Sequence, residues 1–355
     1  MWFKRAGVLQ TPILLSGIVA IVALIGAFGS PTVSRVATLA LIAVIFVCGL
    51  STFSGNSGVM SFGHVAFMAI GAYTAAYLTI PVKLKAALFP DMPDALSFLV
   101  RIHAPLPVAV FIGGLMAIVF SVLTAPVVAR LSGLQSGIAT LALLLIVYNV
   151  LGSWTAVTRG SSSMVGIPQR TTAWNALAFA IAAVAIAWLY RRSRSGLQLQ
   201  ASREDYWAAV AAGIEVGRHR AYAWMLGAGL CGAAGALYAG LLTSFNINGF
   251  FLSATFAFVV MIVAGGYLSL SGAVLGAVLI SALQEVLRRF QDGQFTGGSP
   301  LPAGVADLVL ALILLIILIK APQGLMGVRE LRIPSPRAVT LPRRPSKPSP
   351  APATP

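Results

Sequence analysis

The sequence predicts an all-α fold, a polytopic bundle of about ten membrane-spanning helices. Of its 355 residues, 58% are hydrophobic and only 9% are charged, whereas a soluble domain has about 25% charged residues. The mean hydropathy is +0.90. The few charges are unevenly spaced, and long stretches of the chain contain none. Together these observations exclude a soluble enzyme, a disordered chain and a disulfide-stapled secreted domain.

The individual spans follow from the charge-free stretches, because a helix needs about 20 apolar residues to cross a bilayer. These stretches are 6–34, 36–82, 102–129, 131–158, 171–190 and 221–284. The second has room for two spans and the last for three, while a final apolar segment is interrupted only by Asp307. The predicted spans are 9–29, 33–53, 61–81, 105–129, 137–157, 172–190, 221–243, 253–269, 271–289 and 302–320.

The first stretch also loosely resembles a signal peptide, because Lys4 and Arg5 precede an apolar run that ends in Ala27-Phe28-Gly29. Retention of this helix as a first span is the simpler prediction. An even number of spans places both termini on one side, together with the loop 191–220. Most of the 24 basic residues fall on that side, so the positive-inside rule predicts that both termini are cytoplasmic.

The predicted domains are a membrane domain, 1–320, and a basic, proline-rich tail, 321–355. The tail has no long apolar run, so we expect it to be disordered, with contact to anionic lipid as one role. Within the membrane domain, small residues recur every four positions in the seventh span, at Ala228, Gly232, Ala236 and Gly240. Such a stripe predicts close packing of helix backbones.

Several kinds of chemistry are missing from the sequence. The three histidines are far apart and lack partners at metal-ligand spacing, and no Gly-Lys dipeptide exists to form a phosphate-binding loop. The positive net charge of +15 reflects membrane topology and the tail, so it does not indicate nucleic acid as a partner. Glu285 and Asp307 are the acidic residues that approach a span, and both lie near its predicted outer end. Pairing with Arg288 or Arg289, or contact with interfacial water, is the preferred interpretation of each, and a proton relay is the alternative. A transporter of this composition therefore needs an external source of energy.

The loop 191–220 is the predicted contact with such a motor. Ser202 is placed to cap a helix, with Glu204 and Asp205 in the first turn, where acidic residues favour the helix dipole. An apolar stripe follows at helical spacing, and Gly213 ends the pattern. The stripe consists of Trp207, Val210, Ala211 and Ile214. A helix that lies against its own bundle or the membrane is the alternative interpretation.

At four places the sequence resembles the permeases of ABC importers, most closely the branched-chain amino acid type (LivM-like). The motifs are Arg203-Glu204-Asp205 with Ala208-Ala209 and Ala212-Gly213-Ile214; the stretch from Gly55 through Ser61-Phe62-Gly63-His64 to Gly71-Ala72-Tyr73; Gly166-Ile167-Pro168; and Gly235-Ala236-Leu237-Tyr238-Ala239. The resemblance covers about residues 35–320.

The resemblance implies an ABC importer permease fold and a multi-pass location in a bacterial inner membrane. It also implies a homologous second permease subunit, two cytoplasmic ATP-binding subunits and a periplasmic substrate-binding protein. This chain would need no cofactor, since its partners would bind ATP and Mg²⁺. The residues that would couple it to the ATPases are Arg203, Glu204, Asp205, Trp207, Ala208, Ala209, Gly213 and Ile214.

Four polar residues, Asn56, Ser57, Ser61 and His64, are candidates for the translocation path. The glycines around them predict irregular backbone, which a bilayer tolerates only beside protein or water. Hydrogen bonding between helices, without substrate contact, is the alternative for each. Two other functions also remain open: import of urea or short amides by the same architecture, and ion-coupled secondary transport.

Overall fold

The computed structural model describes residues 2–90, 92–93, 98–292, 302, 304–321, 324–327 and 330–331. Within these ranges the chain is helical, as the composition predicts. The elements are α1 (Trp2–Phe28), α2 (Pro31–Ser57), α3 (His64–Thr79), α4 (Val82–Leu88), α5 (Phe98–Arg101), α6 (Leu106–Arg130), α7 (Gly133–Ser153), α8 (Thr155–Thr158), α9 (Ala173–Arg192), α10 (Arg194–Glu204), α11 (Tyr206–Ala211), α12 (Val216–Leu242), η2 (Ile247–Phe250), α13 (Leu252–Gly265), α14 (Leu270–Gln291) and α15 (Val305–Lys320).

Eight helices in the described ranges are long and apolar enough to cross a membrane, fewer than the ten predicted spans. The predicted spans at 61–81 and 302–320 correspond to α3 and α15, which have 16 residues each. In the first case residues 58–63 are not helical, so only part of the charge-free stretch is helix. α3 then bends by 118° into α4, and counting this pair as one broken span gives nine.

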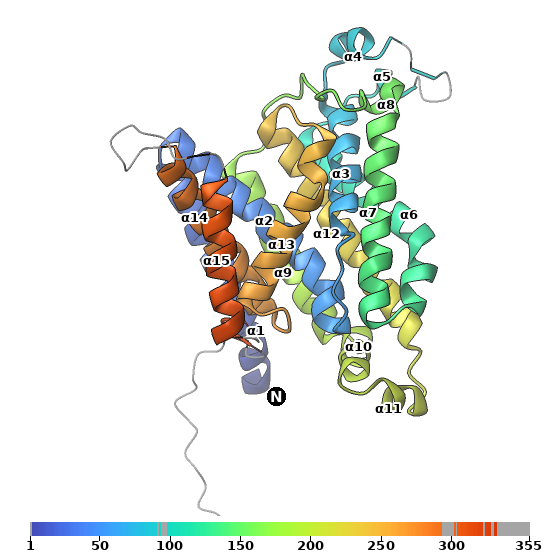
Figure 1. Cartoon of the computed structure of the whole chain (residues 1–355), viewed down its shortest axis with the longest axis vertical. Helices are drawn as coiled ribbons and strands as arrows, with labels where there is room; N and C mark the ends of the chain where they lie inside the picture. The colour runs from blue at the N-terminus through green and yellow to red at the C-terminus, as the bar shows by residue number, and fades with distance from the viewer. Residues whose placement is uncertain are drawn as a thin grey trace, which may run out of the picture.

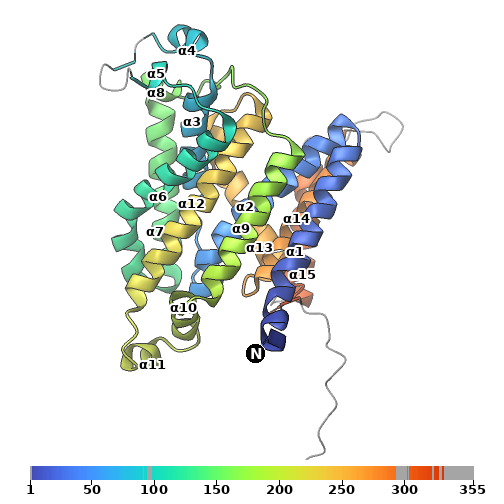
Figure 2. The same ribbon diagram turned by 180° about the vertical axis from the view of Figure 1, so that it is seen from behind.

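The long helices run between two ends of the bundle (Figure 1). α10 and α11 lie at one, which we call the α11 end, and α4, α5 and α8 lie at the other, the far end. The N-terminus and the last turn of α15 both lie at the α11 end, as Figure 2 shows from behind. This agrees with the even number of membrane crossings expected from the sequence. The assignment of the α11 end to the cytoplasm stays a prediction.

α2 is the central helix of the bundle, and every residue from Ala37 to Ser57 except Leu39 is buried. It packs against α1, α9, α12 and α14. Ser30 caps its first turn by accepting a hydrogen bond from the Val33 N–H, and Pro31 occupies the first helical position, which needs no N–H donor. From Ala40 to Ser57 the residues on every face of α2 are consequently surrounded by protein.

The predicted stripe of small residues on α12 is packed against α6 and α3. A Cβ atom at Gly232 would lie 2.5 Å from the Cβ of Ala117 on α6. One at Gly235 would overlap the Met68 carbonyl group on α3, and one at Gly71 would overlap the carbonyl of Gly232. Backbones at this separation leave no room for larger side chains, so the stripe sets the crossing of the three helices.

Candidate functional site

A break in the helical backbone separates α2 from α3. Gly58 ends α2 in the left-handed conformation, with φ of 72°, and donates its N–H to the Ser54 carbonyl. Side chains take over the role of helical carbonyls in the next residues: the N–H of Val59 donates to Ser57 Oγ at 3.2 Å, and that of Phe62 to Thr140 Oγ1 on α7 at 3.2 Å. Irregular backbone is thus satisfied inside the protein, as the bilayer requires.

The four candidate path residues lie in or beside this break, and all are buried. Asn56 donates to the Thr52 carbonyl at 2.9 Å, and Ser57 donates to the Phe53 carbonyl at 2.7 Å. Ser61 Oγ and His64 Nδ1 are 2.8 Å apart. The structure therefore joins Ser61 to His64, while Asn56 and Ser57 bind carbonyls of their own helix.

His64 lies in an aromatic enclosure formed by Phe53, Phe67 and Trp224. Its Nε2 atom has no hydrogen-bond partner among the described residues. The adjoining void, between Ser61, His64, Phe46 and Phe258, is too small for a water molecule. The conformation described here is thus closed around these residues, and their contact with a substrate stays a prediction.

The loop between α9 and α12 contains two short helices, whereas the sequence predicts one helix capped by Ser202. Asp205 is the actual cap of α11, because its carboxylate accepts the Ala208 N–H at 2.9 Å. Ser202 is a buried residue in the last turn of α10, and its hydroxyl donates to the Leu199 carbonyl at 2.8 Å. The capping prediction at Ser202 is therefore wrong, since packing of this turn against the bundle continues α10 through Glu204.

The end of α11 is as the sequence predicts. Gly213 adopts a φ of 81°, its N–H donates to the Val210 carbonyl, and the N–H of Ile214 donates to the Ala209 carbonyl. This pair of bonds is a common helix terminator that requires a left-handed residue at its centre. A glycine supplies that conformation without the strain of a side chain.

α11 presents an apolar surface that nothing in the described chain covers. Trp207 is 79% exposed, and Tyr206 and Val210 are exposed beside it. Ala208 and Gly213 are exposed as well, whereas Ala209 is buried and Ile214 half-buried. Both views place α11 at the extreme of the bundle, beyond α10 (Figures 1 and 2). The arrangement is suited to contact with another protein.

Two arginines connect this loop to the end of α2. Arg203 donates from Nη1 to the Gly55 carbonyl at 2.8 Å, and its side chain covers Gly58, where a Cβ would lie 2.5 Å from Arg203 Cγ. Arg191, at the end of α9, donates to Asn56 Oδ1 at 3.4 Å and to the Leu268 carbonyl at 2.7 Å. Arg203 therefore points into the membrane domain, whereas its neighbour Glu204 is exposed.

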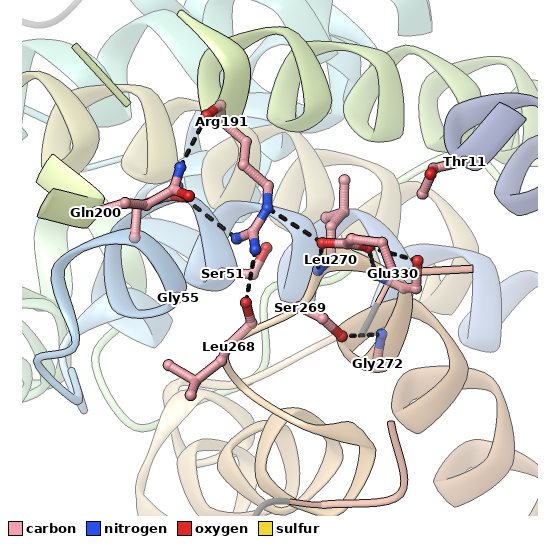
Figure 3. Close-up of polar contacts among 12 residues, drawn as sticks. Thr11, Ser51, Gly55, Arg191, Gln200, Leu268, Ser269, Leu270, Gly272 and Glu330 are labelled. Carbon is pink, nitrogen blue, oxygen red and sulfur yellow. Dashed lines mark hydrogen bonds and ion pairs between the residues drawn. The ribbon is translucent and has the colours of Figure 1, made fainter. Parts of the chain in front are cut away.

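We call these contacts between the loop 191–220 and the end of α2 the junction. Glu330, far along the sequence, also contributes to it (Figure 3). Its carboxylate lies 3.1 Å from Arg191 Nε and accepts the backbone N–H groups of Leu270 and Ser271, each at 3.0 Å. The Ser271 hydroxyl also donates to it, at 2.6 Å. A carboxylate here is stabilised by a guanidinium and by the first turn of α14 together.

Residues near Glu330 also contact the bundle, although the sequence analysis assigns 321–355 to a disordered tail. The N–H groups of Leu325 and Met326 donate to the carbonyls of Ala264 and Gly265, and Thr11 on α1 donates to the Leu331 carbonyl. Residues 332–355 lie outside the described chain, so disorder there stays a prediction. Sequence reasoning missed Arg191 and Glu330, and the one available signal was that Glu330 is the only acidic residue of the tail.

Comparisons with known proteins identify relatives of the chain. A family model described as "Branched-chain amino acid transport system / permease component" matches residues 32–318. The chain is also 25% identical, over 303 residues, to a protein of Methanocaldococcus jannaschii named "Probable branched-chain amino acid transport permease protein LivH". That match covers 80% of this chain and 88% of the relative. No solved structure matches the chain.

Proposed function

The chain belongs to the family of branched-chain amino acid transport permease components, and from this premise we propose that it is the membrane subunit of an ATP-driven importer of such amino acids. It acts with a homologous second permease subunit, two ATP-binding subunits at the α11 end and a periplasmic substrate-binding protein. ATP and Mg²⁺ are bound by the partners. The α11 end faces the cytoplasm of the cell, and the chain is located in its inner membrane.

The exposed apolar surface of α11 is the observation that carries this proposal. A capped helix held by Asp205 and Gly213, with Trp207 at its surface, fills a groove on an ATPase subunit. A large aromatic side chain supplies much contact area at low entropic cost, and such residues dominate the energy of many interfaces. Closure of the ATPases on ATP then displaces α11 relative to the bundle.

Arg203 carries that displacement to the membrane domain. Only Glu204 and Asp205 separate Arg203 from the start of α11. Its side chain binds the last turn of α2 through the Gly55 carbonyl. Three residues later Gly58 begins the break that leads to Ser61 and His64. Because the break lacks a regular hydrogen-bonded ladder, it is the part of this region that deforms most readily. Movement of α2's end therefore opens or closes the buried segment around His64.

Uncoupling by changes in α11 tests the interface. Gly213→Val strains a left-handed residue, at a cost of about 1–2 kcal/mol, and Ile214→Ala or Trp207→Ala removes apolar contact. In proteoliposomes that contain the complete complex, we expect these variants to lose ATP-driven leucine uptake while the chain remains in the membrane. Gly133→Val is the matched control, since Gly133 also has a positive φ and has open space around it. Normal uptake by all three α11 variants would contradict the proposal.

Arg203 has a separate prediction. Arg203→Lys keeps the charge but loses the fork that binds the Gly55 carbonyl and Glu204 at once. We expect ATP hydrolysis by the assembled complex to continue and the number of leucine molecules transported per ATP to fall about tenfold or more, as expected for loss of a charged hydrogen bond. Arg218→Lys, at an exposed position on the same loop, should leave this ratio unchanged. A ratio unaffected by Arg203→Lys would remove Arg203 from the coupling route.

Two measurements separate the alternatives. Uptake that collapses with an ionophore but ignores the removal of ATP would indicate a secondary carrier. Uptake of urea or a short amide, with no competition from leucine, would keep the architecture and change the substrate.

A further inference from the structure

A half-open cavity of about 290 Å³ lies between α2, α13 and α14, with contributions from α3 and α12. Its walls are largely apolar, and Leu39, Ile42 and Phe258 are representative. Polar groups from Tyr238 and from one side of α14 also line it, namely Ser281, Gln284, Glu285 and Arg288. An apolar cavity of roughly 300 Å³ or more with a few converging polar groups is the usual form of a small-molecule site.

The charged end of the cavity lies in the second half of α14, which spans Leu270–Gln291. Glu285 is 15 residues beyond Leu270, or about 22 Å along α14 from the α11 end, and the hydrocarbon core of a bilayer is about 30 Å thick. Ionisable side chains within a membrane-spanning helix usually face protein or water and are often functional. This side of α14 is therefore unsuited to face lipid.

Glu285 forms ion pairs with Arg288, which also lines the cavity, and with Arg289, which does not. Arg288 Nε lies 3.0 Å from Glu285 Oε2, and Arg289 Nε lies 2.7 Å from Glu285 Oε1. The two lining groups differ in exposure, at 13% for the Glu285 side chain and 55% for that of Arg288. A carboxylate thus lies deeper in the cavity than the guanidinium.

We propose that this cavity receives a zwitterionic amino acid with an aliphatic side chain on its way through the membrane domain. The ligand's ammonium group binds Glu285, its carboxylate binds Arg288 nearer the opening, and its side chain packs against Leu39, Ile42 and Phe258. Because the Glu285 carboxylate lies deeper than the Arg288 guanidinium, the cavity favours a ligand that carries both charges. A lipid phosphate would be repelled by the carboxylate. The assignment rests on the proposed function for its ligand, but the cavity can be tested without transport.

Water access is the first test, and it needs only the full chain in membranes. Ser281→Cys places a thiol in the cavity, whereas Leu279→Cys places one on the other side of α14, where Leu279 is exposed. The native Cys48 and Cys231 are fully buried and give little background. We expect a membrane-impermeant thiol reagent applied at the far end to label Ser281→Cys and not Leu279→Cys, and leucine to slow the labelling. Equal absence of labelling at both positions, the result for a groove filled by lipid or by another subunit, would overturn the proposal.

Transport by the complete complex is the second test. Glu285→Gln and Arg288→Gln each remove one charge that binds the ligand, so we expect the KM for leucine uptake to rise about tenfold with little change in kcat. Glu285→Asp should recover part of the loss. Leu279→Ala is the control, because Leu279 is exposed on the other side of α14 and neither lines the cavity nor contacts Glu285 through an ion pair, so its KM should stay unchanged.

The outcomes distinguish the two hypotheses. If the wild-type complex takes up no leucine, the proposed function fails, and protection of Ser281→Cys by leucine then decides the cavity separately. If the wild-type complex is active while Glu285→Gln and Arg288→Gln retain the wild-type KM, or if the KM of Leu279→Ala rises as much as theirs, the cavity assignment is wrong.

Discussion

Replacement of Gly235 by alanine is expected to prevent most of the chain from reaching a folded, membrane-inserted state. The added Cβ would overlap the Met68 carbonyl on α3, and neither α12 nor α3 has a flexible side chain at this contact that could move aside. Overpacking of a well-packed interior costs about 1–3 kcal/mol even where side chains adjust. Here the backbones of α3 and α12 must themselves separate, so the loss of folding free energy should lie at the upper end of that range.

Gly17→Ala is the control for this substitution, because Gly17 lies on α1 with no atom close to its Cβ position. The measurement is the thermal unfolding of each variant in detergent, followed by size-exclusion chromatography. Gly17→Ala should unfold like the wild type, and Gly235→Ala should give little monodisperse protein. Equal profiles for the two variants would show that α3 and α12 can move apart at low cost.

Removal of the Glu330 carboxylate is the second change with a large expected effect. Glu330→Ala leaves Arg191 without its counter-ion and leaves the Leu270 and Ser271 N–H groups without their acceptor. Breaking a buried ion pair costs about 3–5 kcal/mol, and the slight exposure of this pair places the expected loss near 3 kcal/mol. We therefore expect lower stability together with faster proteolysis at the turn between α13 and α14.

Glu204→Ala is the matched control, since Glu204 also pairs with an arginine but its side chain is 73% exposed. Surface ion pairs contribute about 0–1 kcal/mol, so this variant should unfold close to the wild type. Glu330→Gln separates charge from hydrogen bonding, because its amide oxygen still accepts from the first turn of α14. If Glu330→Ala is as stable as Glu204→Ala, the segment near Leu331 has no structural role.

Much of the fold could be predicted because membrane insertion leaves a strong local signal. Stretches without charge mark the spans, and the position of Gly213 marks the end of α11, since both depend on residues close together in sequence. The bounds of individual spans were less accurate, and α3 and α15 are shorter in the described chain than the spans predicted for them. Whether the charge-free residues before His64 are helical depends on partners such as Thr140 on α7, which local pattern does not include.

The junction at the α11 end was not predictable for the same reason. Ser202 and Asp205 are both good helix caps, and the choice between them follows from burial of Ser202 against the bundle. Arg203 was expected at a surface for the ATPase, but its side chain binds Gly55, nearly 150 positions earlier in the chain. Glu330 and Arg191 form a pair across a similar separation, and no periodicity connects them.

The central position of α2 has a consequence for biogenesis. α2 emerges second from the ribosome, yet three of the helices that surround it, α9, α12 and α14, are synthesised only later. Until they arrive, the hydroxyl and amide groups of Ser51, Ser54 and Asn56 have lipid as their neighbour, at an energetic cost. A nascent chain stalled before α12 therefore leaves these polar groups of an otherwise apolar helix without protein neighbours inside the bilayer. Mutations that slow the docking of α12 should reduce the amount of protein in the cell before they affect the rate of transport.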